Sequence, residues 1–353
     1  MDLALYHPEL GYYARAAQRS GRAGDFFTSV DVGPIFGELL ARQIVEMAGI
    51  LTTARPLPFD LVEAGAGNGR LSADILRALD ATAPALLRRL RLHLVEASPL
   101  ARQAQCDTLG DRANHLASAS ADLPAQYEGV LVANELLDAM PVHQVVMRED
   151  GLRETYVDEE HGRLIARDGA PSTPELGAYL GQLDVELEPG WRAEINLRAR
   201  AWVSEAARRL TRGFLVLIDY GHPAADLYSA WHSGGTLASF RRHTSAASPA
   251  GSRTPSWLAD PGDQDITSHV DFTSVGRAAG AEGLTILGFM DQTYFLMGLL
   301  GPDGGRELSP AERRGVKTLI LPGGLGSTFK VMVLGKGVGS PSLLGGSCGA
   351  RVT

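Results

Sequence analysis

Short apolar runs alternate with stretches of helical spacing along this chain, and the alternation predicts an α/β fold with a parallel sheet. Strands are expected where apolar residues dominate, at Leu61–Glu63, Leu90–Val95, Gly129–Ala133, Phe214–Ile218, Leu284–Phe289 and Phe329–Leu334. Helices are expected where apolar residues recur every three or four positions, at about 35–47, 69–79, 199–210 and 272–281. Ligands of such sheets bind beyond the carboxyl ends of the strands, so residues there are the candidates for function.

Two segments and the tail depart from this order of strands and helices. From Val142 to Arg167 polar and apolar residues alternate around two turn signals, which predicts an inserted antiparallel meander. The segment Thr244–Pro255 is rich in Ser, Ala, Pro and Gly and is expected to be a loop. The tail from Gly337 has no periodicity, so we expect it to be frayed.

A glycine-rich turn follows the first strand, with Glu63, Gly65, Gly67, Gly69 and Arg70 in order. Alternate glycines let the backbone take positive φ and approach a ligand, and the following helix directs its N-terminal amides at the turn. The dinucleotide fingerprint G-x-G-x-x-G needs a glycine at the position of Arg70. A carboxylate before three glycines is instead typical of the S-adenosylmethionine turn of Rossmann-like methyltransferases. On these residues alone, an ordinary tight connection explains the turn equally well.

Further acidic residues lie near the ends of later segments. Glu96 follows the second strand, where a carboxylate in a doubly wound fold accepts the ribose hydroxyls. Alternatively, Glu96 is a charge near the start of a helix that Ser98 caps. Asp122 and Leu123 suit the edge and the face of an adenine, or they belong to a solvated loop.

The third strand is followed by Asn134 and Glu135, which places two polar side chains where the reactive group of a ligand would lie. Polar residues at this position also commonly mark the exit of a strand to solvent. Asp138 lies one helical turn further on. His143 and His269 are candidate bases, although a packed, hydrogen-bonded histidine is the more common explanation of each.

Composition narrows the class of protein. The 353 residues carry a net charge of −8, which argues against a nucleic-acid partner. No apolar run approaches the ~18 residues that span a bilayer. The N-terminus has no signal-peptide pattern, so a cytoplasmic protein without membrane insertion is expected. Two distant cysteines and nine scattered histidines match no disulfide or metal spacing, and no metal is expected.

Several motifs, in order over nearly the whole chain, are similar to those of the MidA-type methyltransferase family. That family includes a mitochondrial assembly factor that methylates an arginine of a complex I core subunit. The matching segments are LYHPELGYY from Leu5, GDFFTS from Gly24, EAGAGNGRL from Glu63, VEASP from Val95, ANELLDAMPVHQ from Ala133, IDYG from Ile218, DPGDQDITSHVDF from Asp260 and FKV from Phe329. The resemblance implies a seven-stranded, Rossmann-like class I methyltransferase sheet with an inserted meander and an N-terminal lid.

The resemblance also divides the chain and assigns roles to residues. It implies a lid at 1–50, a methyltransferase domain at 51–336 with insertions at about 142–190 and 222–268, and a flexible tail at 337–353. S-adenosyl-L-methionine would be bound by Gly24, Asp25, Phe26, Thr28, Ser29, Glu63, Gly65, Gly67, Gly69, Glu96, Ala97, Asp122, Leu123 and Asn134. The glycine turn would hold the methionine part, Glu96 the ribose, and the segment from Gly24 to Ser29 would cover the site.

From its position at the strand end, Glu135 is the first candidate for the catalytic residue, and Asp138 is the second. Asn134 would orient the acceptor or the cofactor amine. A carboxylate can hold the always-charged guanidinium of arginine bidentately. The resemblance implies that the substrate is an arginine of a protein such as a respiratory complex I core subunit. There are two alternatives, a non-catalytic assembly chaperone that binds the cofactor and a small-molecule N- or O-methyltransferase. A nucleotide-dependent dehydrogenase is disfavoured, because Arg70 occupies a glycine position of its fingerprint.

Overall fold

The computed structural model describes residues 1–14, 28–52, 58–241, 244–245, 255–301, 308–321 and 325–348. Its central sheet has the strand order β14-β15-β9-β4-β1-β2-β3, and the short strand β13 pairs with the end of β9. These strands are β1 (Phe59–Ala64), β2 (Leu90–Val95), β3 (Leu116–Ser120), β4 (Tyr127–Asn134), β9 (Leu210–His222), β13 (Val270–Asp271), β14 (Thr285–Asp291) and β15 (Phe329–Lys336). β15 is antiparallel to both neighbours, and β3, β2, β1, β4 and β9 are parallel. All six predicted strands and the Rossmann-like order are confirmed.

The apolar pattern does not predict β3, which forms one edge of this sheet. Its sequence Leu-Ala-Ser-Ala-Ser carries one large apolar residue, and all five side chains are at least partly exposed. Pairing with β2 along one edge makes it a strand, because the backbone hydrogen bonds of the ladder do not depend on side-chain type.

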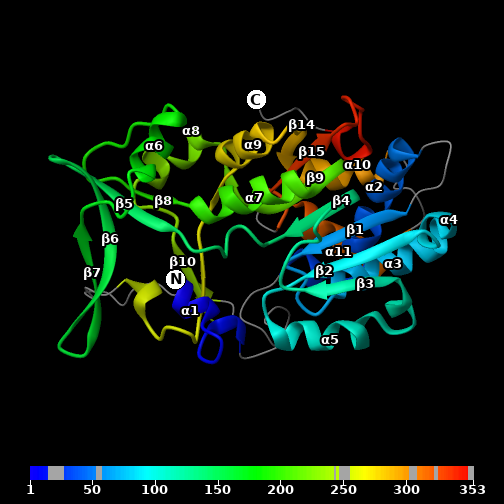
Figure 1. Cartoon of the computed structure of the whole chain (residues 1–353), viewed down its shortest axis with the longest axis horizontal. Coiled ribbons are helices and arrows are strands. Elements are labelled where there is room, and N and C mark those ends of the chain that lie inside the picture. The colour runs from blue at the N-terminus through cyan, green and yellow to red at the C-terminus, as the bar shows by residue number, and fades with distance from the viewer. Residues whose placement is uncertain are drawn as a thin grey trace.

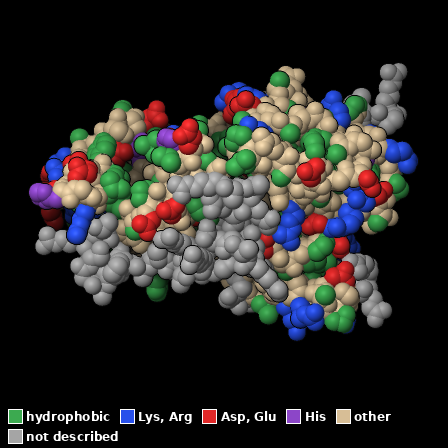
Figure 2. Space-filling model, turned by 90° about the horizontal axis from the view of Figure 1, so that it is seen from below, with side chains coloured by type: hydrophobic (Ala, Val, Ile, Leu, Met, Phe, Trp, Pro, Cys, Tyr) green, Lys and Arg blue, Asp and Glu red, His purple; other side chains and the backbone are tan. Residues whose placement is uncertain are grey.

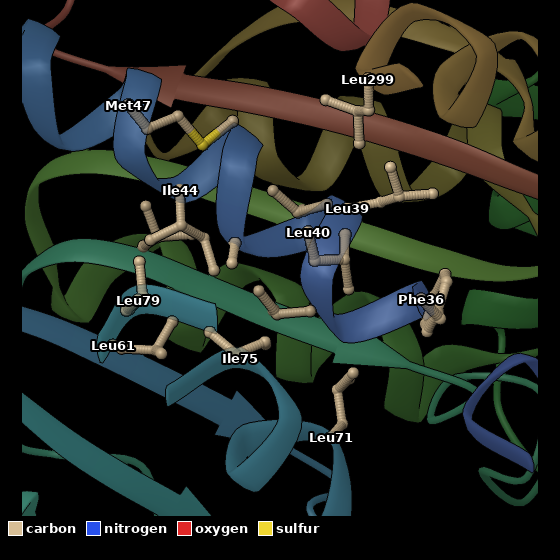
Figure 3. Close-up of a cluster of buried hydrophobic side chains, with 14 of the residues drawn as sticks. Phe36, Leu39, Leu40, Ile44, Met47, Leu61, Leu71, Ile75, Leu79 and Leu299 are labelled. Atoms are coloured by element: carbon tan, nitrogen blue, oxygen red, sulfur yellow. The ribbon is translucent and has the colours of Figure 1, made fainter. Parts of the chain in front are cut away.

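Helices cover both faces of the central sheet, because successive residues of a strand point to opposite faces. The α-helices are α1 (Asp2–Tyr6), α2 (Ile35–Leu51), α3 (Arg70–Thr82), α4 (Pro84–Leu87), α5 (Pro99–Leu109), α6 (Glu175–Gln182), α7 (Leu197–Arg209), α8 (Ala224–Leu227), α9 (Phe272–Ala281), α10 (Gln292–Leu300) and α11 (Pro310–Ile320). Leu61 packs in the core shared with α2, α3, α10 and α11, part of which Figure 3 shows. Its neighbour Val62 packs in the core shared with α7 and α9.

A second sheet lies at the end of the molecule away from α4, at the left of Figure 1. It has the order β7-β6-β5-β8 and is antiparallel throughout. Its strands are β5 (His143–Arg148), β6 (Gly151–Glu160), β7 (Arg163–Gly169) and β8 (Arg192–Ile195). The predicted meander is present as β5 to β7, and α6 and α8 share a core with Val145 and Ile195 of this sheet.

The N-terminal segment lies between the two sheets in Figure 1. Leu5 of α1 and Tyr12 share a small core with Ile266. Ile266 belongs to a third sheet, made of β10 (Ala238–Arg241), β11 (Thr244–Ser245) and β12 (Asp265–Thr267). The Tyr6 hydroxyl also donates to the carbonyl of Ala139 at 2.9 Å, so the segment is fixed against the connection that follows β4. The loop expected within 244–255 lies largely outside the described residues.

The frayed tail expected from Gly337 is wrong for the residues up to 348. Residues Leu344–Gly346 form a 3-10 turn, and the Gly345 N–H donates to Oε1 of Gln43 on α2 at 3.0 Å. A Cβ at Gly298 of α10 would lie 2.3 Å from the Leu344 carbonyl oxygen. The lack of a side chain at Gly298 therefore lets the tail pack closely, which compositional reasoning does not reveal.

Charged side chains of both signs are interspersed over the described part of the face drawn in Figure 2. Opposite charges placed among one another give a mixed surface rather than a field of one sign. No helix among the described residues combines the length and the apolar character needed to cross a bilayer.

Candidate functional site

A cavity of about 660 Å³ opens at the carboxyl ends of β1, β2 and β4. Its walls come from the glycine turn after β1, the residues after β2 and β4, the start of α7, and the N-terminal segment. Tyr6 and Tyr13 line it from that segment, and the Tyr13 hydroxyl donates to Oδ1 of Asp265 at 2.9 Å. The volume falls within the roughly 300–1,000 Å³ of sites that bury a small organic ligand.

The glycine turn forms one wall of the cavity and is fixed by its own backbone. The N–H groups of Gly65 and Ala66 donate to the Val95 carbonyl at 2.9 and 3.1 Å, which ties the turn to β2. Gly67 has a φ of 52°, and a Cβ there would meet nothing within 4 Å. Glycine is thus favoured at this position by backbone conformation rather than by crowding. Gly69, with a φ of 85°, is the N-cap of α3 and does not line the cavity.

Two carboxylates border the turn and both are held by hydrogen bonds. Glu96 accepts the N–H of Gly67 on Oε2 at 2.8 Å and the N–H of Ser98 on Oε1 at 2.7 Å. Glu63 accepts both the N–H and the hydroxyl of Ser72 on Oε2. Burial nonetheless raises the pKa of Glu63 to about 7, because desolvation outweighs these bonds. Each carboxylate oxygen has two lone pairs, so Glu96 can still accept a hydrogen bond from a ribose hydroxyl.

Asn134 and Glu135 lie at the end of β4 and line the cavity on its other side. Glu135 has a φ of 54°, a left-handed conformation that is uncommon for glutamate. The N–H of Glu135 donates to the Ile218 carbonyl of β9 at 2.9 Å, which holds this conformation. The Asn134 amide donates to Oε1 of Glu135 at 3.0 Å. Backbone strain that the surroundings maintain is concentrated at functional sites, which marks Glu135 as a candidate.

Further acidic groups lie behind Glu135, and we call Glu135, Asp138, Asp219 and Asp265 the acid cluster. Burial, and then the charge of Asp219, raise the pKa of Asp138 well above its usual range. Burial raises the pKa of Asp219 to about 6, although its Oδ2 accepts the N–H groups of Leu136 and Leu137 at 3.1 and 2.8 Å. Burial is also the largest cause that raises the pKa of Glu135 to about 8.

The structure brings eight of the predicted site residues to the cavity, and they are Thr28, Glu63, Gly65, Gly67, Glu96, Ala97, Asn134 and Glu135. Asp138 and Ser29 are buried next to it without lining it, and the Ser29 hydroxyl donates to Oε1 of Gln292 at 3.1 Å. Gly24, Asp25 and Phe26 lie outside the described residues.

Two predicted adenine contacts do not line the cavity. The Asp122 side chain is exposed, and Leu123 packs in the core with α7, where its carbonyl accepts a hydrogen bond from Arg209. Their neighbour Ala121 lines the cavity instead. The chain turns away from the cavity after Ala121. The small residues before Asp122 do not show from the sequence where this turn occurs.

Sequence reasoning missed several residues that line the cavity, among them Tyr6, Tyr13, Arg198 and Trp202. Both tyrosines belong to the motif LYHPELGYY, and a motif does not show which of its rings face a cavity. Arg198 and Trp202 lie on α7, a helix that the apolar spacing predicted without showing which of its residues line a cavity. Asp219 directly follows the predicted strand Phe214–Ile218, but its hydrogen bond from the N–H of Leu136 depends on the tertiary fold.

The residues around the cavity fit S-adenosylmethionine. Oδ1 of Asn134 is buried and has no hydrogen-bond partner among the described residues, so an amine donor would satisfy it. Glu96 offers a carboxylate at the tip of the strand next to the glycine turn, which suits a ribose. The acidic groups also suit a ligand that carries an ammonium and a sulfonium.

Comparisons with known proteins point the same way. Residues 39–290 match the Methyltransf_28 family of S-adenosyl-L-methionine-dependent methyltransferases. The mitochondrial protein arginine methyltransferase NDUFAF7 of Danio rerio is 30% identical over 84% of this chain and 71% of its own length. Its Drosophila melanogaster homolog is 26% identical over 96% of this chain and 80% of its own.

A solved structure is also similar to this chain. A COG1565 superfamily member from Burkholderia thailandensis, crystallised with S-adenosyl-homocysteine, is 31% identical in sequence. The match covers 99% of this chain and 90% of that protein, with a TM-score of 0.86. The Rossmann-like fold read from the strand order is therefore shared over nearly the full length of the chain.

Proposed function

Because the chain belongs to the Methyltransf_28 family of S-adenosyl-L-methionine-dependent methyltransferases, we propose that it methylates an arginine side chain of a protein. Two relatives are named protein arginine methyltransferases, which supports a protein substrate. The observation that carries the choice of arginine is Glu135, a carboxylate that lines the cavity and is backed by three further acids. A guanidinium is the cation that a carboxylate grips best, since it offers a planar fork of donors.

The glycine-turn half of the cavity is the proposed cofactor site. Glu63, Gly65 and Gly67 would hold the methionine part, while Glu96 and Ala97 would hold the ribose. Thr28 would close the rim from the N-terminal side. When bound, S-adenosylmethionine would supply a methyl group from its positively charged sulfur to a nitrogen held in line with the S–CH3 bond, with S-adenosylhomocysteine as the leaving group.

Glu135 is the proposed catalytic residue and prepares the acceptor. A guanidinium is charged at any working pH, so the attacking nitrogen must lose a proton as its bond to carbon forms. The Glu135 carboxylate would orient the guanidinium and accept that proton. The pKa of Glu135 is about 8, close to neutral, which suits a group that takes up and releases a proton. Asn134 fixes one oxygen of this carboxylate through its hydrogen bond.

The remaining acid cluster would act through Glu135. The charge of Asp219 is one of the causes that raise the Glu135 pKa. Without a bound cation, the acid cluster therefore opposes ionisation of Glu135. A bound guanidinium would remove this penalty, because an opposite charge at short range favours the carboxylate. The cluster therefore favours a cationic acceptor over a neutral one. Asp138, buried with its Oδ1 unpaired among the described residues, would lie behind Glu135 without touching the acceptor.

We further propose that the protein acts in the cytoplasm on a respiratory complex I core subunit. The support is the family resemblance of the sequence motifs. In this proposal residues 1–50 close over the cofactor, 51–336 carry the reaction, and the insertions at about 142–190 and 222–268 provide surface for the protein partner.

Transfer of a labelled methyl group tests the function. The purified chain is incubated with S-adenosylmethionine labelled in its methyl group and with lysate from a strain that lacks the corresponding gene. We expect label in one protein band, and methylarginine after complete hydrolysis of that band. The Glu135→Gln variant is the control for label that enters without this active site.

The alternatives give different results in the same assay. Label in the small-molecule fraction would indicate a small-molecule N- or O-methyltransferase. Calorimetric binding of S-adenosylhomocysteine without any transfer would indicate an assembly chaperone that only binds the cofactor. Label on a residue other than arginine would contradict the proposed acceptor.

A further inference from the structure

Three histidines that are distant in sequence meet at the carboxyl end of β9, and we call His222, His232 and His269 the histidine cluster. His222 is the last residue of β9, and His269 directly precedes β13, whose Val270 pairs with Gly221. His232 ends the 3-10 turn Ala230–His232. One ring nitrogen of each residue lies within 4.8 Å of the other two. Parallel pairing of β13 with β9 thus brings together residues that no sequence spacing would connect.

The surroundings prepare these imidazoles to act as ligands. Nδ1 of His232 lies 2.9 Å from the backbone carbonyl of Asp226, which fixes Nδ1 as the donor and leaves Nε2 with a free lone pair. Nδ1 of His269 is buried and has no hydrogen-bond partner among the described residues. A buried polar atom without a partner is costly, and binding to a metal ion would satisfy it.

We propose that the histidine cluster binds a divalent metal ion of the zinc class, with the three imidazoles and one water as ligands. Three nitrogen ligands around tetrahedral Zn²⁺ lie about 3.3 Å apart, because each Zn–N bond is about 2.0–2.1 Å. Side-chain rotation of the rings would have to shorten the present separations, which reach up to 4.8 Å. Imidazole suits zinc, copper and nickel, whereas calcium and magnesium prefer oxygen ligands.

Charge at the histidine cluster is compatible with a bound cation. Lys330 is the neighbouring cation, and its ammonium pairs with Oδ1 of Asp291 in an ion pair of which both side chains are largely shielded from solvent. Asp226 and Asp291 add negative charge near His222. The histidine cluster therefore lies in surroundings where one lysine is offset by two carboxylates.

The metal site is separate from the cofactor cavity, since none of the three histidines lines that cavity. The ion would link the end of β9 to the segment that carries β12 and β13. That segment also carries Asp265 of the acid cluster. We infer a structural role, in which the metal fixes this segment beside the acceptor end of the site.

Zinc binding by the full-length, untagged chain tests the proposal. The protein is dialysed against a chelator and then titrated with Zn²⁺ in competition with a chromophoric chelator. We expect one tight site per chain and a higher Tm with zinc present. Loss of a ligand in His232→Gln or His269→Gln should weaken zinc binding by at least about 10–100-fold, the effect of losing even an outer-shell partner. His161→Asn, at an exposed position of positive φ in the β6–β7 turn, is the matched control and should bind as the wild type does.

Each outcome decides the question. Equal zinc binding by the wild type, His232→Gln and His161→Asn would mean an adventitious surface ion and would overturn the proposal, as would no binding by the wild type. Co²⁺ gives visible absorption in a tetrahedral nitrogen site, and its loss in His232→Gln would support the ligand set. Binding of S-adenosylhomocysteine by the same variants shows that they are folded. Because that binding is independent of the histidines, failure of the metal proposal would leave the proposed methyltransferase function untouched.

Discussion

The acidic groups at the two ends of the cavity have different surroundings. At the glycine turn, Glu96 accepts two backbone N–H groups, and Glu63 accepts an N–H and a hydroxyl from Ser72. At the end of β4, Glu135 lies next to Asp138 and Asp219, whose charges oppose one another. Carboxyls at both ends accept hydrogen bonds, but at the end of β4 several of them also lie close enough to repel one another when charged.

This difference separates the roles of the two ends. A pre-formed set of hydrogen bonds costs little to organise when a ligand arrives, which suits a cofactor that every turnover needs. Crowded carboxyls instead gain most from a cationic ligand, which suits the selection of a guanidinium. Substitutions at one end should therefore change the reaction, and substitutions at the other should change cofactor binding.

The largest effect is expected at the acid cluster. Glu135→Gln removes the group proposed to accept the proton and should lower kcat by about 10²–10⁴-fold. S-adenosylhomocysteine affinity should remain nearly unchanged, because the glycine turn is intact. Both are measured by methyl transfer and by calorimetry. Glu128→Gln, at the other end of the same strand, is the control. Wild-type turnover by Glu135→Gln would exclude Glu135 from catalysis.

The opposite pattern is expected at the cofactor end. Glu96→Ala removes a charged acceptor and leaves the N–H groups of Gly67 and Ser98 without their partner. A charge-assisted hydrogen bond contributes about 1.5–3 kcal/mol, so cofactor affinity should fall by about 10–100-fold. Calorimetry with S-adenosylhomocysteine measures this, and Asp107→Ala on the exposed side of α5 serves as the reference. Unaltered affinity would remove Glu96 from the cofactor site.

The rate should depend on pH mainly through the acid cluster. Glu135 must be ionised to accept a proton, and its pKa of about 8 means that the ionised fraction grows as the pH rises. We expect kcat/KM to increase about tenfold per pH unit below this pKa and to level off above it. The residual activity of Glu135→Gln should lack this rise. A wild-type profile that is flat from pH 6 to pH 9 would contradict the assignment.

The smallest effect concerns stability without ligand. Burial raises the pKa of Asp219 to about 6, of Glu63 to about 7 and of Glu135 to about 8. Between the ordinary carboxyl pKa and these values the native state binds more protons than the unfolded state, so the free energy of unfolding falls as the pH rises. We expect Tm to decrease by about 5 °C from pH 5 to pH 8.

The same variants assign this loss of stability to one end of the cavity. In Glu135→Gln the part of the decrease above about pH 7 should become smaller, and in Glu128→Gln it should persist unchanged. A Tm that rises from pH 5 to pH 8 in the wild type would show that the buried carboxyls are ionised and compensated in the native state.

The sequence predicted correctly those features of the structure that depend on residues close together in the chain. The strand, glycine turn and helix from Phe59 to Thr82 form where the pattern predicts them, because their conformation is set by neighbouring residues. The edge strand β3 and the packed tail were missed, since both depend on partners far away in the chain. Leu123 was assigned to the ligand, yet it fills a core that its apolar character explains equally well.

The sequence alone determined the fold class, the family resemblance and the positions of Glu63, Glu96 and Glu135 at strand ends, because periodicity and turn chemistry act over a few residues. Only the tertiary structure decided which acids crowd together, which are hydrogen-bonded, and that His222, His232 and His269 meet. Burial and proximity arise from pairing between remote strands, and they set the electrostatic energy of each carboxyl and imidazole. A one-dimensional pattern of residue types does not contain those distances.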